Sequence, residues 1–360
     1  MIPIARPLIG DEEKAAVMAV LESGQLAQGS RVAEFERRFA ERCGTAFAVA
    51  TSSGTTALHL ALLAHGIGQG DEVITTSFSF IATANSILFT GAKPVFADID
   101  PATYNLHVDH VARLITPRTK AILPVHLYGH PADMGPLMEL ATQHGLVVIE
   151  DACQAHGARY RDRTVGTFGA GCFSFYPTKN MTSGEGGMVT TNDEMIVERL
   201  RMLRQHGMNR QYHHEVLGFN FRLTDLQAAV GVAQLDKLDD WTAARIANGN
   251  YYSSHLPQDV APTVMPDCEH VYHQYTLRIP GDRDQVVALL AEQGVQARVY
   301  YPMPIHKQPL YHDLGYHDHL PHAERASHQV LSLPVHPSIT EEERSQVVQA
   351  VNEVLELVSS

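Results

Sequence analysis

The segment Leu146–Ala158 (LVVIEDACQAHGA) decides the fold prediction, because its apolar run ends abruptly in carboxylates. The run LVVI is typical of a strand buried on both faces, and Asp151 stands where such a strand would end. A second apolar run leads into Cys172–Asn180 (CFSFYPTKN), which contains Lys179. Ligands in open α/β sheets bind at the carboxyl ends of the strands. We therefore expect Asp151 and Lys179 to border one site.

Strands and helices alternate around these two segments. The expected strands cover residues 46–50, 72–75, 94–99, 120–125, 146–150, 172–176 and 187–190. The expected helices cover residues 11–22, 32–43, 55–65, 80–89, 108–115 and 132–144. Crossover helices of this kind make most of a sheet parallel. The prediction is an α/β protein with a mostly parallel sheet of the seven-stranded type, flanked by helices.

The pattern changes in the last third of the chain. A helical stretch over 223–255 is followed by a strand at 274–279 and helices at 284–293 and 341–358. This arrangement indicates a smaller α+β domain. We expect a large ligand-binding domain over residues 1–240 and a small C-terminal domain over residues 241–360.

A phosphate site is predicted after the first of the expected sheet strands. Ser53, Gly54 and Thr55 open the helix expected at 55–65. Backbone N–H groups and the positive dipole end at a helix N-terminus favour an anion, and glycine allows a close approach. The alternative is a plain helix cap and turn.

Taken together, these three features suit pyridoxal phosphate chemistry. A lysine such as Lys179 can bind the cofactor aldehyde covalently, and a carboxylate such as Asp151 can keep the pyridine nitrogen protonated. Each feature has an ordinary alternative, since a single lysine is often a solvated loop residue and an aspartate often a helix cap. Their order along the chain favours the cofactor site.

Composition agrees with a globular enzyme of the cytoplasm. The chain has 360 residues, 44% hydrophobic and 19% charged, with a net charge of −13. A strongly negative charge argues against nucleic acid or an anionic membrane as a partner. The N-terminal segment lacks a signal-peptide pattern, and no apolar stretch approaches the about 18 residues of a membrane span. The four cysteines show no metal-type spacing, so we expect them to be reduced.

Histidine is abundant, and several histidines lie close together after residue 305. Proline, glycine and tyrosine residues between them indicate a loop, and no pair has the helical spacing of a zinc site. We therefore predict no metal.

The ordered set of motifs resembles the DegT/StrS group of sugar aminotransferases, which are fold-type I pyridoxal phosphate enzymes. The resemblance covers nearly the whole chain. The motifs that carry it include Gly70–Ile74, Ala82–Asn85, Pro94–Ile99, Pro124–Gly129, Glu150–Gly157, Ser174–Asn180, Gly184–Met188, Arg204–Gly207, Gly218–Leu223 and Tyr301–His306. It implies a large domain like that of aspartate aminotransferase.

The resemblance also implies a role for each matching residue. Lys179 corresponds to the cofactor-binding lysine that also moves the proton, and Asp151 to the partner of the ring nitrogen. The other implied cofactor contacts are Gln154 beside the ring hydroxyl, Phe80 stacked on the ring, and Ser53, Gly54, Thr55, Ser174 and Asn220 at the phosphate. Tyr301 and His306 are candidate substrate contacts.

The implied function is transamination of a keto sugar on a nucleoside diphosphate, for glycan or secondary-metabolite synthesis. The implied cofactor is pyridoxal 5'-phosphate, with pyridoxamine 5'-phosphate as the intermediate form and glutamate as the donor. Asn220 would come from a second subunit, so a homodimer with shared sites is implied. Glu185 favours amination at C4, and a C3-keto sugar or a keto-cyclitol is the alternative. Some members of the group are dehydratases with a histidine in place of the lysine, and Lys179 argues against that alternative. A regulatory or sensor protein is the alternative outside enzymes, and Lys179, Asp151 and Gln154 together argue against it.

Overall fold

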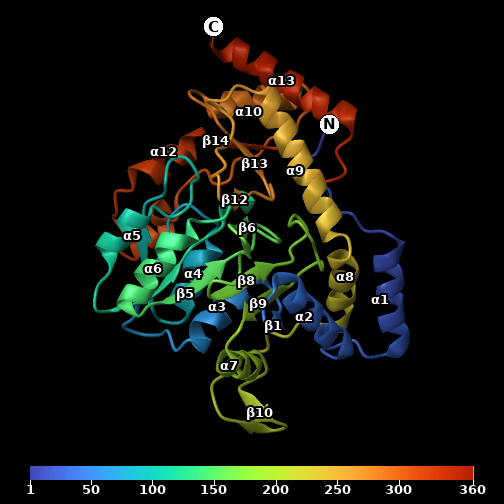
Figure 1. The fold of residues 1–360 in the computed structure, drawn as a ribbon, viewed down its shortest axis with the longest axis vertical. Helices are drawn as coiled ribbons and strands as arrows, with labels where there is room; N and C mark the ends of the chain where they lie inside the picture. Colours follow the sequence, from blue (N-terminus) through green and yellow to red (C-terminus); the bar gives the residue numbers. More distant parts are fainter. Residues whose placement is uncertain (360) are drawn as a thin grey trace.

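A central seven-stranded sheet organises the computed structural model, which describes residues 1–359 (Figure 1). The strand order is β1-β9-β8-β5-β4-β2-β3. The strands are β1 (Phe47–Thr51), β2 (Glu72–Thr76), β3 (Lys93–Ala97), β4 (Thr119–Leu123), β5 (Val147–Asp151), β8 (Ala170–Ser174) and β9 (Gly187–Thr191). Strand β9 runs antiparallel to both neighbours, and the other pairings are parallel. The predicted fold class is confirmed.

Crossover helices cover the sheet because parallel strands need long connections. They are α3 (Gly54–Ala64), α4 (Ala82–Phe89), α5 (Val108–Leu114) and α6 (Met134–His144), whereas α7 (Glu194–Arg204) follows β9, the last strand of the sheet along the chain, and packs against α3 and β1. Helix α3 lies against β8 and β9 and is buried along most of its length, which explains its run of alanine and leucine. Helices α1 (Asp11–Ser23), α2 (Ser30–Cys43) and α8 (Asp225–Leu235) pack together beside the sheet (Figure 1).

The helical stretch expected at 223–255 is two helices. Helix α8 begins at a capping box, in which Thr224 and Gln227 satisfy each other's backbone N–H groups. The chain leaves the helix at Asp236 and Lys237, and α9 (Leu238–His255) follows. The Lys237 amine is held at the break by the carboxylates of Glu12 and Glu13 in α1. Helix α7 was not predicted from the sequence.

The C-terminal part of the chain has its own apolar core. Strands β13 (Tyr275–Arg278) and β14 (Val330–Leu333) pair antiparallel, and α10 (Arg283–Glu292) and α13 (Glu341–Ser359) pack together beside them. Ile2 belongs to this core and pairs in parallel with Val295. The N-terminal segment therefore packs against the C-terminal part of the chain. We propose the domain division at residue 240, near the start of α9, which spans the two parts (Figure 1).

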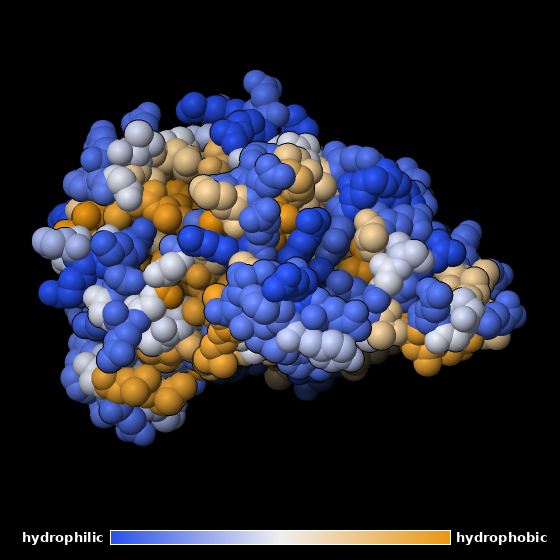
Figure 2. Space-filling view, turned by 90° about the horizontal axis from the view of Figure 1, so that it is seen from below, coloured by the Kyte–Doolittle hydropathy of each residue, from blue (hydrophilic) through white to orange (hydrophobic). Residues whose placement is uncertain are grey.

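A short hairpin projects from the lower end of the molecule (Figure 1). It consists of β10 (Met208–Arg210) and β11 (His213–His214), and Tyr212 at its tip is exposed. Figure 2 shows this face, where hydrophobic patches are separated by hydrophilic side chains. Among residues 1–359, none of the helices combines the length and the apolar character that a membrane crossing requires.

Candidate active site

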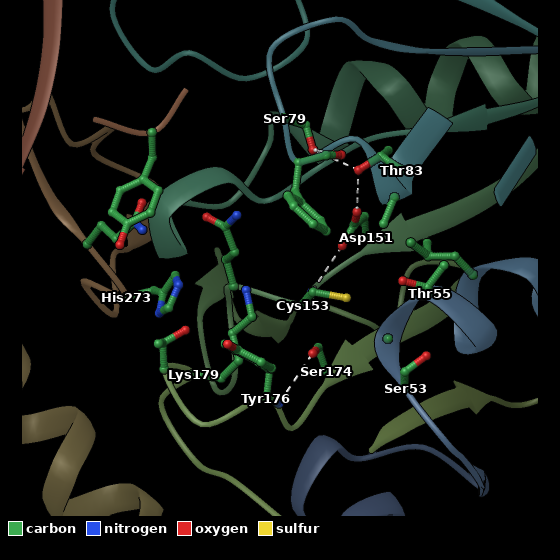
Figure 3. Close-up of a pocket in the computed structure, with 18 of the residues that line it drawn as sticks. Ser53, Thr55, Ser79, Thr83, Asp151, Cys153, Ser174, Tyr176, Lys179 and His273 are labelled. Atoms are coloured by element: carbon green, nitrogen blue, oxygen red, sulfur yellow. Dashed lines mark hydrogen bonds between the residues drawn. The ribbon is translucent and has the colours of Figure 1, made fainter. Parts of the chain in front are cut away.

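A cavity of about 510 Å³ opens at the carboxyl ends of β5 and β8 (Figure 3). Strand β5 ends in Asp151, β8 ends in Ser174, and α3 begins beside them at Gly54. The lining residues are Ser53, Gly54, Thr55, Leu58, Ser79, Phe80, Ala82, Thr83, Asp151, Cys153, Gln154, Ser174, Tyr176, Thr178, Lys179, Glu185, His273, Gln274, Tyr300 and Tyr301. The site therefore lies where strand ends of a parallel sheet converge.

One wall of the cavity is the N-terminus of α3. Ser53 caps the helix by accepting a hydrogen bond from the Thr56 backbone N–H at 3.2 Å. A Cβ atom at Gly54 would come within 2.6 Å of the Ser174 Cβ and 2.9 Å of the Cys153 Sγ. Only glycine fits there, and the first N–H groups of a helix have no partner within the helix. This wall suits a phosphate group.

Another wall presents the buried carboxylate of Asp151. Its Oδ2 accepts a hydrogen bond from the Thr83 hydroxyl at 2.7 Å, and its Oδ1 accepts one from the Cys153 backbone N–H at 3.2 Å. The Ser79 hydroxyl lies 2.7 Å from that of Thr83 (Figure 3). These contacts fix the orientation of the carboxylate, which is the requirement for a group that holds a ring nitrogen.

Lys179 stands on the turn that follows β8. Its backbone N–H donates to the Tyr176 carbonyl at 2.9 Å, which tightens the turn and directs the side chain into the cavity (Figure 3). Burial lowers the pKa of the Lys179 amine, and the nearby Cys153 and Asp151 partly counter this effect. A lowered pKa increases the neutral fraction of the amine, and the neutral form is the nucleophile and the base.

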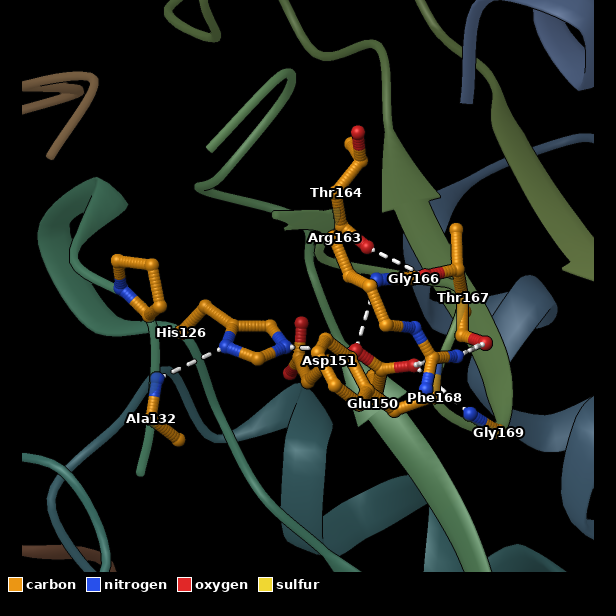
Figure 4. A network of polar contacts seen from close by, with 12 residues as sticks. His126, Ala132, Glu150, Asp151, Arg163, Thr164, Gly166, Thr167, Phe168 and Gly169 are labelled. Atoms are coloured by element: carbon orange, nitrogen blue, oxygen red, sulfur yellow. Dashed lines mark hydrogen bonds and ion pairs between the residues drawn. The ribbon is translucent and has the colours of Figure 1, made fainter. Parts of the chain in front are cut away.

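A fully buried pair, Glu150 and His126, lies behind Asp151 (Figure 4). The Nε2 atom of His126 is 3.1 Å from Oε2 of Glu150, and the Ala132 backbone N–H donates to the other ring nitrogen. The same carboxylate accepts backbone N–H groups from Gly166, Phe168 and Gly169. The network thus ties the end of β5 to two loops. His126 and Glu150 lie in two separate sequence motifs, and nothing in either motif indicated that the two side chains meet.

Gln154 and Tyr301 line the cavity and are hydrogen-bonded to each other. The Gln154 amide donates to the Tyr301 hydroxyl at 3.0 Å, and its Oε1 accepts the Tyr128 backbone N–H at 2.8 Å. Phe80 is 57% exposed in this single chain, and its ring centroid lies 6.3 Å from that of Tyr301. An exposed aromatic face in a polar cavity suits a flat ring.

The structure brings together most of the residues predicted from the sequence. Ser53, Gly54, Thr55, Phe80, Asp151, Gln154, Ser174, Lys179 and Tyr301 all line the cavity. Asn220 does not line it. Asn220 is exposed, and its backbone pairs with that of Gln205. His306 is buried elsewhere, with its Nε2 3.3 Å from Oε1 of Glu324.

Sequence reasoning missed several lining residues, including Ser79, Thr83, Tyr176, His273 and Gln274. The sequence contained a weak indication for Thr83, because a spacing of four residues at the start of a predicted helix places the hydroxyls of Ser79 and Thr83 side by side. The sequence contained no indication for His273 and Gln274, since these residues lie beyond the predicted domain boundary at residue 240 and reach the cavity from there.

The cavity fits pyridoxal phosphate on its own geometry. A glycine-dependent helix N-terminus, an oriented carboxylate and a lysine with a lowered pKa surround one space large enough for a small ring. With the seven-stranded sheet, these features define the class of fold-type I pyridoxal phosphate enzymes.

The chain belongs to the DegT/DnrJ/EryC1/StrS aminotransferase family, whose sequence profile matches residues 7–352. It is therefore a pyridoxal phosphate-dependent aminotransferase. The crystal structure of DesV from S. venezuelae, solved with a ketimine intermediate, superimposes with a TM-score of 0.93 at 43% identity. That alignment covers 96% of this chain and 95% of the other.

Three relatives of known sequence are also similar over most of their length. The chain is 44% identical to a dTDP-3-amino-3,4,6-trideoxy-alpha-D-glucose transaminase of Streptomyces venezuelae, over 96% of this chain and 93% of the relative. It is 43% identical to the GDP-perosamine synthase of Caulobacter vibrioides, over 98% of each. It is also 44% identical to a protein of Geobacillus stearothermophilus named pleiotropic regulatory protein, over 95% of each.

Proposed function

We propose that this enzyme transfers an amino group to a keto sugar carried on a nucleoside diphosphate. The observation that carries the proposal is a cavity lined by Lys179 and Asp151 in a chain with two similar relatives that are named for sugar nucleotides. Glutamate is the proposed amino donor and amino sugar nucleotides the product. We propose a cytoplasmic enzyme, which agrees with four unpaired cysteines.

Pyridoxal phosphate, when bound, supplies an aldehyde that exchanges amino groups and a ring that accepts electrons from the substrate carbon. Lys179 is the proposed catalytic base and acid. Its Nζ takes the proton from the donor's α-carbon and later returns a proton to the sugar carbon. The lowered pKa of Lys179 supports this role, because the amine must be neutral to accept the proton.

The proposed role of Asp151 is to hold the proton on the ring nitrogen through its carboxylate. The hydroxyl of Thr83 and the N–H of Cys153 orient that carboxylate. Gln154 is the proposed contact of the ring hydroxyl, and Phe80 covers one ring face. Ser53, Gly54, Thr55 and Ser174 are proposed to hold the phosphate.

We propose a homodimer in which Asn220 completes the partner's phosphate site. Asn220 is exposed and lies outside the cavity of its own chain, which agrees with a role in another subunit. The flanking Phe219 and Phe221 rings stack at 4.8 Å, close to His59 of α3. These rings are only partly buried in the single chain and offer an apolar surface to a partner. A two-fold dimer gives two equal sites.

The position of amination is the finer part of the proposal. Glu185 lines the cavity and favours a 4-keto sugar by resemblance. A C3-keto sugar is the second candidate, because the similar Streptomyces relative is named for a 3-amino sugar nucleotide. Tyr301 lines the cavity and is the proposed sugar contact, whereas His306 lies apart from it.

A panel of keto sugar nucleotides tests the proposal directly. The enzyme is first treated with glutamate, which is expected to convert the bound cofactor to its pyridoxamine form and thereby change its absorbance. Each keto sugar is then added, and its true substrate restores the original spectrum. If no 3-keto or 4-keto sugar nucleotide restores it, while a keto-cyclitol does, the proposed substrate class is wrong.

A further inference from the structure

Three arginine side chains are buried among residues 1–359, namely Arg204, Arg245 and Arg283, which are 4%, 5% and 6% exposed. Arg204 lies against Glu36 at 2.5 Å, and Arg283 against Asp284 at 2.6 Å. Within the described chain, Arg245 forms no ion pair with a carboxylate. A buried charge is costly unless a counter-charge accompanies it. Arg245 therefore lacks the partner that the other two possess.

The surroundings of Arg245 leave part of its guanidinium unsatisfied. Its Nη1 donates to the carbonyl oxygens of Tyr272 at 3.2 Å and His273 at 3.4 Å, but Nε has no partner in the described structure. Burial lowers the pKa of Arg245 to about 10. The side chain is thus still a cation at neutral pH, and two neutral carbonyl groups do not cancel its charge.

A cavity of about 20 Å³ borders Arg245 and is separate from the large one. It lies under the N-terminal strap formed by Ala5–Leu8, next to α8 and α9. The other lining residues are Pro177, Thr178, Lys179, Asn180, Thr182, Gln234, Trp241 and Pro337. A space of this size holds about one water molecule or an ion of similar size.

The charge around this cavity has one sign. The exposed Arg6 and the buried Arg245 line it as cations, Lys179 lines it with an amine whose pKa is lowered by burial, and none of its lining residues is acidic. Arg6 is only loosely paired, with its Nη2 3.7 Å from Oε1 of Glu343. The nearby Glu13 accepts from Gln234 and is already paired with Lys237 at 2.8 Å. In a protein with a net charge of −13, a pocket lined by two arginines and by no acidic residue attracts an anion locally.

We propose that this small cavity binds a monovalent anion of the size of chloride, as the counter-ion of Arg245. The anion would sit close to the cofactor cavity, because Thr178 and Lys179 line both spaces. A negative charge there stabilises the protonated form of a nearby amine. The site thus couples the salt composition of the solution to the lysine, independently of which sugar is the substrate.

Crystals of the cofactor-bound enzyme grown or soaked in sodium bromide give the direct test. Bromide replaces chloride and is located by its anomalous scattering. The expected result is one bromide in the cavity, in contact with Arg245. A water molecule there, with no anomalous signal, overturns the proposal.

Thermal unfolding in solution provides the second measurement. At constant ionic strength, replacing the large anion gluconate by chloride is expected to raise the melting temperature saturably, by about 1–3 °C. Arg245→Met should abolish the rise. Arg283→Met is the matched control, because it removes a buried arginine that has its own carboxylate, and it should keep the rise.

A third variant keeps the arginine and fills the space. Ala5 lines the cavity, so Ala5→Val should block the anion and remove the chloride effect even if Arg245→Met does not fold. An equal chloride effect in wild type and Ala5→Val, or no effect in wild type, overturns the proposal.

Discussion

The Nε2 atom of His126 lies 3.1 Å from Oε2 of Glu150, and both side chains are fully buried directly behind the strand end that carries Asp151. The backbone is tied at the same point, since the His126 N–H donates to the Asp151 carbonyl at 3.0 Å and the Asp151 N–H donates to the Pro124 carbonyl at 2.8 Å. The carboxylate proposed to hold the ring nitrogen therefore has its backbone fixed by residues outside the cavity.

The first prediction concerns this pair. Glu150→Gln replaces an acceptor of three backbone N–H groups by an amide that can accept fewer, so a buried donor loses its partner. We expect the free energy of unfolding to fall by about 1–3 kcal/mol. We also expect slower reaction with glutamate, because Asp151 shifts. A stability loss with an unchanged single-turnover rate would show that the pair is structural only.

The second prediction concerns Lys179. Lys179→Ala should still retain the cofactor through the helix N-terminus and Asp151, but turnover should fall by at least about 10²–10⁴-fold, because the proton-transfer group is lost. Cofactor content by absorbance and steady-state rates check both parts. Lys120→Ala, at an exposed lysine, is the control and should behave as wild type. A Lys179→Ala enzyme with near-normal turnover refutes the proposed role.

The third prediction concerns Asp151. Asp151→Asn keeps the size of the side chain, but a neutral amide no longer stabilises a protonated ring nitrogen. We expect the single-turnover rate with glutamate to drop by about 10²-fold or more. Asp193→Asn serves as the control, because Asp193 only caps α7 and asparagine caps helices equally well. Equal rates for wild type and Asp151→Asn would contradict the proposed role of Asp151 at the ring nitrogen.

The fourth prediction tests the shared site. Lys179→Ala subunits are mixed with Asn220→Ala subunits under conditions in which subunits exchange. If Asn220 serves the partner's site, a mixed dimer has one site with both lesions and one with neither, so activity should recover toward half of wild type. Exchange is verified by mass spectrometry with a tag on one variant. Verified mixed dimers without recovery would place Asn220 in its own subunit's site or in none.

The fifth prediction concerns acid stability. Burial lowers the pKa of His130 and His336 to about 4 and that of His156 to about 3, against an ordinary value of 6.5. At a pH between the folded-state pKa and the ordinary pKa of these histidines, the unfolded chain binds more protons than the folded one. The free energy of unfolding therefore falls as the pH drops from about 6.5 toward 4. Urea unfolding at several pH values measures this fall.

A variant isolates one histidine in that measurement. His156→Leu reduces by one the number of protons that the unfolded chain binds in excess of the folded chain. The slope of unfolding free energy against pH should therefore flatten by about 1.4 kcal/mol per pH unit between pH 4 and 6. His312→Leu, at an exposed histidine, should leave the slope unchanged. Equal slopes for wild type and His156→Leu contradict the assignment to His156.

Much of the sheet and its crossover helices could be predicted because their signals are local. The apolar run before Asp151 forms the expected buried strand, and the strand expected at 172–176 is present but ends at Ser174. A helix begins after Ser53 because its capping pattern is also local. The break between α8 and α9 escaped prediction, because the contact of Lys237 with α1 is distant in sequence.

The sequence by itself determined the strand that ends at Asp151, the helix N-terminus and the lysine, since each depends on neighbours within a few residues, whereas β3, β4 and β8 each end two residues before the predicted end. Only the tertiary structure decided that Thr83 holds Asp151, that His126 meets Glu150 and that Arg245 is buried without a carboxylate. These contacts join segments far apart along the chain, and apolar periodicity carries no information about which polar side chains will meet. Their partners are fixed only when the sheet order and the packing of α9 bring those segments together.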